Sequence, residues 1–322
     1  SDGASKIPDL AKRAAELGMP AVGITDHGNM HGAYEMYTNC VANGVKPIIG
    51  IEAYVTPETA RQDKSRVHWG TEAQRRDDVS GGGLITHLTM WAENDEGLVN
   101  LIKASSVANL EGRVMRYPRM DKEVLATYSK GVIASSGCPS GIIQTRLRLG
   151  QFDEALRAAG EFQDIFGKDN FFIELMDHGL PIETQVTGDL LTIAKKLNAP
   201  LLATNDSHYV HAEDAQAQDA MLCINSGSRL DDPDRFKFDG TGYYIKTAEE
   251  MRELFKDHPD ACDNTLVIAE RCNVMFDDHE DGAFMPKFPC PEGWDETSLF
   301  LKKVEEGLEK RYDRSEEHTS EL

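Results

Sequence analysis

Histidine and carboxylate side chains follow two apolar segments of this chain, at the point where each segment ends. Residues 25–29 read Thr-Asp-His-Gly-Asn after the apolar run 21–24, and residues 205–208 read Asn-Asp-Ser-His after the run 200–203. Residues two apart in an extended backbone point to the same side, so we expect Asp206 and His208 to converge. Imidazole and carboxylate groups at strand ends are what a metal-dependent hydrolase on a β/α scaffold needs.

Three further residues could join them. Glu52 lies in an otherwise apolar predicted strand, where a carboxylate without a cation or donors costs at least a few kcal/mol. His87 opens another predicted strand, and Cys138 follows a third. Each also has a structural interpretation: His27 as a surface turn residue, His87 as an edge histidine, and Cys138 as a small buried side chain. Their joint occurrence at successive strand ends favours one shared metal site.

The types of these side chains indicate the metal and the reaction. Nitrogen, carboxylate and thiolate together suit Zn²⁺ better than Mg²⁺, and Mn²⁺ remains an option if the thiolate is peripheral. Several ions together would activate water and hold the attacking and leaving oxygens of a phosphoester. Glu174 and His178, also at a predicted strand end, could support the site or the substrate, or only pack the barrel.

Composition limits the alternatives. The 322 residues carry 34 basic and 55 acidic side chains, a net charge of −21, which disfavours nonspecific nucleic-acid coating but not an active site directed at a DNA end. Six cysteines are scattered without a CxxC pair, as is typical of a reducing cytosol. No run approaches ~20 consecutive apolar residues, so we expect no membrane span.

Strand and helix patterns alternate along the first two thirds of the chain. The predicted strands are 21–25, 47–55, 87–92, 131–135, 171–175 and 200–204. Helical periodicity separates most of them, which predicts a parallel sheet or, with ligands at several strand ends, a β/α barrel. Later segments read as helices, ending in a charged amphipathic helix at 295–311.

Four motifs resemble those of a known family, the polymerase-and-histidinol-phosphatase (PHP) domain. They lie at 25–30, 50–54, 137–141 and 203–209, and the resemblance extends over about residues 1–312. The resemblance is greatest to the PHP domains found at the N-terminus of bacterial replicative DNA polymerases. The resemblance implies an α/β fold, a distorted (β/α)7 barrel of the PHP type, with a C-terminal helical segment leading toward a polymerase palm.

The resemblance also implies the ligand sets. Up to three divalent ions would be held by Asp2, His27 and His208, by Glu52, His87 and Cys138, and by Glu52 with Asp206. Asp206, His208 and Glu52 would be the catalytic residues. The family's first motif, a His-x-His shortly before the aspartate that is here Asp2, is absent, so we expect an incomplete site for one ion.

Domains and partners follow from the same resemblance. Residues 1–275 would form the PHP barrel, 276–313 a linker and the start of a polymerase region, and 314–322 a tail foreign to the natural chain. The polymerase carboxylates are expected beyond residue 322. The intact protein would act in the cytoplasm on the primer 3′ end of DNA, with replisome subunits such as a sliding clamp.

Three functions remain open at this point. The domain could be a metal-dependent 3′–5′ exonuclease that proofreads, or a catalytically silent, metal-braced scaffold that docks a separate proofreading exonuclease. A free-standing small-molecule phosphatase is a weaker third. Two groups of basic residues could guide a DNA end or be solvated loops: Arg61, Lys64, Arg66, Arg75 and Arg76, and Arg113, Arg116, Arg119 and Lys122.

Overall fold

The computed structural model describes residues 3–75, 78–276 and 286–312. The chain divides into two compact units, Ser1–Phe276 and Asp277–Leu322, and the second contains the helix α12 (Glu296–Arg311). Two residues named above, Asp2 and Arg76, and the predicted tail 314–322 lie outside the described residues. No helix within the described ranges is both long enough and apolar enough to cross a membrane.

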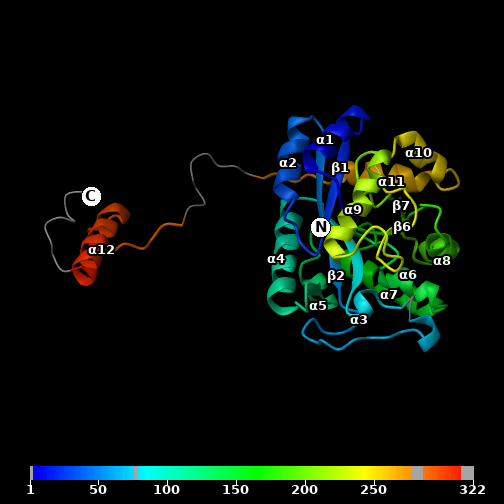
Figure 1. Ribbon diagram of the computed structural model, residues 1–322, viewed down its shortest axis with the longest axis horizontal. Coiled ribbons are helices and arrows are strands. Elements are labelled where there is room, and N and C mark those ends of the chain that lie inside the picture. The colour runs from blue at the N-terminus through cyan, green and yellow to red at the C-terminus, as the bar shows by residue number, and fades with distance from the viewer. Residues whose placement is uncertain (1–2, 76–77, 277–285, 313–322) are drawn as a thin grey trace. The chain divides into compact units, whose positions relative to one another are not determined.

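A single sheet forms the centre of the first unit (Figure 1). Within the described residues its seven strands are β1 (Ala21–His27), β2 (Lys46–Val55), β3 (Thr86–Ala92), β4 (Arg119–Met120), β5 (Val132–Ser135), β6 (Phe171–Leu175) and β7 (Leu201–Ala203). Their order is β1-β2-β3-β5-β6-β7, with β4 beside β2. The α/β fold class is confirmed, as a sheet that curls into half a barrel and whose β1 and β7 are not paired in the described part of the chain.

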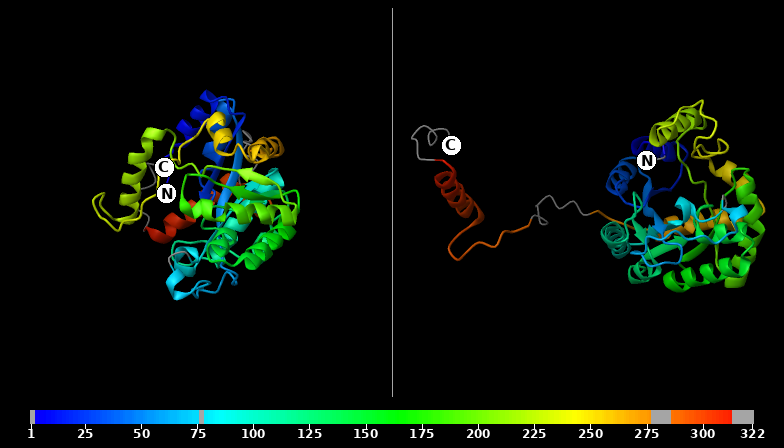
Figure 2. Two further views of the ribbon diagram at one scale, coloured as in Figure 1. Left: turned by 90° about the vertical axis from the view of Figure 1, so that its right-hand side faces the viewer. Right: turned by 60° about the horizontal axis from the view of Figure 1, so that its bottom comes forward.

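Several helices of this unit pack against the sheet. The helical segments described in the unit are α1 (Ile7–Glu16), α2 (Ala33–Ala42), η1 (Glu72–Gln74), α3 (Ser80–Gly83), α4 (Asp95–Glu111), α5 (Lys122–Thr127), α6 (Ile142–Arg148), α7 (Phe152–Phe166), α8 (Pro181–Leu197), η2 (Ala212–Asp214), α9 (Ala215–Ser226), α10 (Ala248–Leu254) and α11 (Pro259–Arg271). Those that pack against the sheet include α1, α2, α4, α7, α8 and α11. In Figures 1 and 2, α1, α2 and α4 lie beside β1 and β2, and α6 to α8 lie toward β6 and β7. The core between helices and sheet is aliphatic and aromatic, as the apolar periodicity predicts.

Strand β3 runs opposite to its neighbours. It pairs antiparallel with both β2 and β5, whereas β1–β2, β5–β6 and β6–β7 are parallel. The expectation of an all-parallel sheet is therefore wrong for this strand, because apolar periodicity carries no information on strand direction. The reversal brings His87, near the start of β3, beside the carboxyl end of β2, where it pairs with Tyr54.

The sequence analysis missed the short elements η1, α3, β4, α5 and α6, and it did not predict the burial of one residue in β4. Arg119 in β4 is fully buried, and its guanidinium donates to the carbonyl oxygens of Gly112, Leu84, Arg61 and Asp63. A buried guanidinium with carbonyl partners holds loops together. It is not available to guide DNA.

Arg61, from the first basic group, is also committed to the fold. Its guanidinium forms ion pairs with Glu111, Asp121 and Glu123, at 2.8 to 3.1 Å. Lys122, from the second group, pairs with Glu161. These cations are neutralised by neighbouring carboxylates, so they offer little net charge to a phosphate backbone.

Glu58 joins the loop after β2 to helices α6 and α7. Arg146 and Arg157 both donate to its carboxylate, and Nζ of Lys122 lies 3.8 Å from Oε1. Burial would raise the pKa of Glu58, but the hydrogen bonds and charges of the two arginines lower it below its ordinary value of 4.5. The ionised form is therefore the form that the fold stabilises.

We expect Gly97→Ala to destabilise the protein by about 1–3 kcal/mol or more, because overpacking against backbone cannot be relieved by a rotamer change. A Cβ at Gly97 in α4 would lie 1.7 Å from the carbonyl oxygen of Gly131. Gly188 in α8 is the matched control, since a Cβ there meets nothing within 4 Å. Gly188→Ala should stabilise by about 0.5–1 kcal/mol. Denaturant unfolding gives the free energy of unfolding of both variants. Equal changes in the two would contradict the close packing of Gly97 in α4 against Gly131.

We expect Glu58→Gln to lower the free energy of unfolding at pH 7 by about 1–3 kcal/mol, the range for hydrogen bonds to charged groups. Because the folded pKa is lowered, this stabilisation is present above the ordinary value of 4.5 and is lost as the pH falls through the folded pKa. Urea unfolding from pH 3 to 8 should show the two proteins converging at low pH. Glu253→Gln, which removes an exposed pair with Lys256, should have little effect at any pH.

Candidate metal centre

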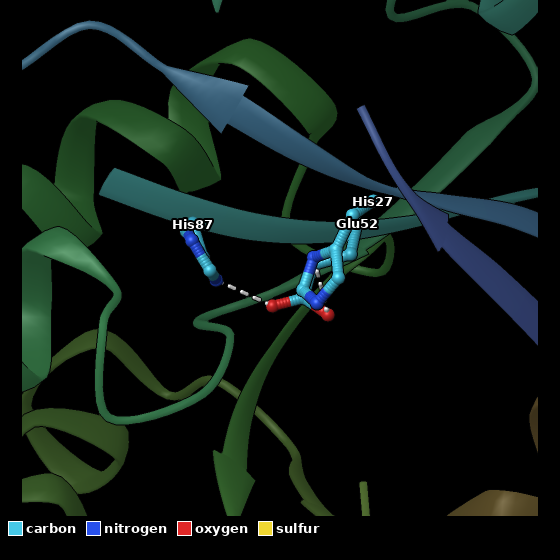
Figure 3. A group of neighbouring side chains, drawn as sticks. All are labelled: His27, Glu52 and His87. Carbon is cyan, nitrogen blue, oxygen red and sulfur yellow. Dashed lines mark hydrogen bonds and ion pairs between the residues drawn. The ribbon is translucent and has the colours of Figure 1, made fainter. Parts of the chain in front are cut away.

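Three neighbouring strands place His27, Glu52 and His87 on one face of the sheet (Figure 3). His27 ends β1 and pairs with Glu52 of β2, while His87 of β3 pairs with Tyr54. Glu52 and Tyr54 are two residues apart, so they point to the same side of β2 and their cross-strand neighbours do the same. The alternation of the strands thus explains why these three side chains meet.

The contacts among these groups are short. Nδ1 of His87 lies 2.6 Å from Oε1 of Glu52, and Nδ1 of His27 lies 3.4 Å from Oε2. Cys138, which follows the left-handed turn at Gly137, places its Sγ 3.4 Å from both Oε1 of Glu52 and Nδ1 of His87. The structure therefore brings together four of the seven predicted ligands, from β1, β2, β3 and the loop after β5.

The carboxylates at this centre are met by histidines, and no described lysine or arginine pairs with them. Burial would raise the pKa of Glu52, but His27 and His87 lower it to about 2, so the carboxylate is ionised. Burial and the charges of Glu52 and Asp206 raise the pKa of the Cys138 thiol well above its usual range. Among the described residues, neither Glu52 nor Asp206 forms an ion pair with a lysine or arginine.

Asp206 and His208 approach the centre by a different route from the one predicted. Strand β7 ends at Ala203, and Asp206 has a φ of +42°, in the left-handed region. The two side chains are therefore brought together by a turn and not by strand alternation: Nδ1 of His208 lies 2.7 Å from the carbonyl oxygen of Asp206 and 3.7 Å from its Oδ1. The expectation of an extended backbone here is wrong.

Asp206 belongs to the same electrostatic environment as Glu52. Burial and the negative charge of Glu52 raise the pKa of Asp206, while His208, His27 and His178 lower it. The side chain of Asp206 is 28% exposed, so it faces both the buried carboxylate and the solvent. Because Asp2 lies outside the described residues, the group of Asp2, His27 and His208 stays a prediction.

Two aromatic rings that the sequence analysis did not single out lie beside the centre. Tyr54 stacks on His27, with 5.8 Å between ring centroids and an interplanar angle of 4°. Phe238 packs edge-on against His208, at 4.7 Å. The position of Tyr54, two residues after Glu52 on the same strand face, is a signal that could have identified it; Phe238 comes from a distant loop and has no local signal.

The residues present fit a divalent cation. A buried ionised carboxylate, a second carboxylate and a thiol converge with imidazoles but without a described lysine or arginine in an ion pair with either carboxylate, and a cation would relieve their repulsion and favour the thiolate. Imidazole nitrogen, carboxylate oxygen and thiol sulfur together are the donor set that Zn²⁺ accepts.

Comparisons with known proteins identify the family of the chain. The PHP domain family matches residues 1–178. The DNA polymerase III alpha subunits of Mycobacterium tuberculosis and Saccharopolyspora erythraea are each 52% identical over 97% of this chain, and that of Borreliella burgdorferi is 38% identical over 97%. The chain spans about a quarter of the length of these relatives, 26% of each.

A solved structure from Bifidobacterium adolescentis is 16% identical, and the match covers 80% of this chain and 92% of that one. Its TM-score of 0.38 is too low to carry an argument about this chain. The family assignment depends instead on the sequence match over residues 1–178, which is more than half of the 322 residues. The chain belongs to the PHP domain family.

Proposed function

We propose that this chain is the N-terminal region of a DNA polymerase III alpha subunit whose PHP domain is a metal-dependent 3′–5′ exonuclease. The similarity to alpha subunits at 52% identity supports the first part. The observation that carries the second part is the contact of one buried carboxylate, Glu52, with His27, His87 and Cys138. The PHP barrel 1–275 and the region 276–313 that leads toward a polymerase are part of this proposal, as are a cytoplasmic location and a sliding-clamp partner.

The two oxygens of Glu52 face different partners. Oε1 lies near His87 and Cys138, whereas Oε2 lies near His27. Glu52 could therefore contribute to two adjacent ions, one with His87 and Cys138 and one on the side of His27 and Asp206. Divalent ions bound there would supply Lewis-acid polarisation of the phosphoryl oxygens and more acidic water.

His208 is oriented to accept a metal or a proton through one defined atom. Its Nδ1 lies 2.7 Å from the carbonyl oxygen of Asp206, and since a carbonyl can only accept, Nδ1 must carry the hydrogen. The other nitrogen, Nε2, then keeps its lone pair in the neutral ring. Packing of Phe238 against the ring limits its rotation, so His208 and the adjacent Asp206 carboxylate would be placed to hold an ion or to accept the proton of the attacking water.

A scaffold that binds metal without catalysis and docks a separate proofreading exonuclease remains the alternative. It requires the same ligands but no turnover, so the metal site and the nuclease activity must be measured separately.

We expect the purified chain to retain divalent metal, preferably Zn²⁺, after dialysis. His87→Ala and Cys138→Ser should each reduce the metal content measured by elemental analysis and lower the melting temperature of the metal-loaded protein, because each removes a ligand. Cys223→Ser is the matched control: it alters a buried cysteine of α9 and should leave the metal content unchanged. Equal metal content in the unaltered chain and in all three variants would contradict the proposed metal site.

We expect Asp206→Asn in the full-length subunit to slow excision of a mispaired 3′ nucleotide by about 100-fold or more, the scale of a lost acid–base or electrostatic group. Primer extension should continue at the unaltered rate. Asp219→Asn is the control. It disturbs the ion pair between Asp219 of α9 and Arg235, and the subunit that carries it should excise at the normal rate. Excision at an unchanged rate in Asp206→Asn, with metal still bound, would favour the scaffold.

A further inference from the structure

Glu174 is a buried carboxylate in β6 whose two oxygens are both occupied by donors from the chain. Its Oε2 accepts hydrogen bonds from Oγ of Ser135, at 2.5 Å, and from the backbone nitrogen of Gly137, at 3.1 Å. Its Oε1 accepts from Oγ1 of Thr204, at 2.5 Å. Only 3% of the residue is exposed. No described lysine or arginine forms an ion pair with it.

The three donors lie within three residues of two predicted metal ligands along the chain. Gly137 directly precedes Cys138, and Thr204 lies two residues before Asp206. These ligands lie in the loops that follow β5 and β7, two strands that do not pair with each other because β6 lies between them. Glu174 is therefore a side chain that bonds to the loops on both sides of its own strand.

The sheet itself does not hold these loops as far as the ligands. Pairing of β5 with β6 ends at Ser135, and pairing of β6 with β7 ends at Ala203, with one further backbone bond from each following residue. The backbone nitrogen of Glu174 also donates to Oγ of Ser136, at 2.9 Å. Beyond the ladder, the side chain of Glu174 bonds to both loops. Gln144 also bonds to the carbonyl oxygen of Gly137, and His178 bonds to that of Asn205.

A carboxylate suits this place because it can accept all three bonds at once. An apolar residue would leave the buried nitrogen of Gly137 and two hydroxyls without their acceptor, which destabilises the arrangement of both loops. Glutamine could still accept through its oxygen and donate to a hydroxyl, so it should preserve most of the arrangement.

We propose that Glu174 is a positioning residue of the metal centre, which fixes Cys138 and Asp206 relative to each other by bonding to the loops after β5 and β7. This inference rests on the metal site of the proposed function. Glu174 acts through the two ligand-bearing loops and not as a ligand.

Cobalt titration of the 322-residue chain tests this role, because Co²⁺ bound to a thiolate gives a charge-transfer absorption that reports the Cys138 bond. Glu174→Leu should weaken Co²⁺ binding by about 10–100-fold, the range for residues that orient ligands, and should reduce that absorption. Glu174→Gln should stay within a few-fold of the unaltered chain. Cys138→Ser must abolish the absorption, which identifies the cysteine concerned.

Gln163→Leu separates loss of positioning from general destabilisation. Gln163 is a buried polar residue of α7 that donates to the carbonyl oxygen of Leu197, and its replacement should lower stability without changing Co²⁺ affinity. If Glu174→Leu does not fold by circular dichroism, Thr204→Val removes one of the three bonds and should weaken Co²⁺ binding by a few-fold.

The outcomes distinguish the two proposals. No cobalt binding by the unaltered chain would overturn the metal site itself. Binding by the unaltered chain, with equal affinity in Glu174→Leu or, where that variant fails to fold, in Thr204→Val, would overturn only the positioning role. An equal loss in Glu174→Gln and Glu174→Leu would also overturn it, since the negative charge and not the hydrogen bonds would then matter.

Discussion

The burial of an ionised carboxylate inside a strand is the constraint on which the centre of this protein depends. Glu52 sits in the middle of β2, a strand that is otherwise almost wholly apolar and buried. Such a charge is costly unless positive or donating groups meet it. Two imidazoles and a thiol meet it here, each from another part of the sheet edge. The strand order, the loop conformations and the charges at this end of the sheet together stabilise the ionised carboxylate of Glu52.

The sequence predicted the elements well where a local pattern determines them. Strand β6 begins and ends at the predicted residues 171 and 175, because a run of apolar residues marks it. Helix α7 shows the same kind of local signal, an apolar helical spacing that ends before Gly167. Glu52, His87 and Cys138 could be proposed as partners because each is chemically unusual in its predicted strand or turn. Their meeting in space follows from strand pairing, which a single sequence does not specify.

Features that depend on tertiary contacts escaped prediction for the same reason. The burial of Arg119 reflects four carbonyl groups from separate loops, none of them marked by a local pattern. The left-handed conformation of Asp206 is uncommon for a residue other than glycine, so the extended reading was the natural one. For Glu174 the sequence allows three roles, support of the site, contact with the substrate and packing of the barrel, and only its three donors bear on the choice among them.

The reversed direction of β3 has a consequence for how this architecture can diversify. In a parallel strand the connection that follows the strand borders the centre. Here the connection before β3, of which residues 56–75 and 78–85 are described, arrives next to His87. Surface connections tolerate insertion and exchange far better than strands do. Relatives could therefore change the surface beside His87 by altering this one segment, while every strand keeps its place.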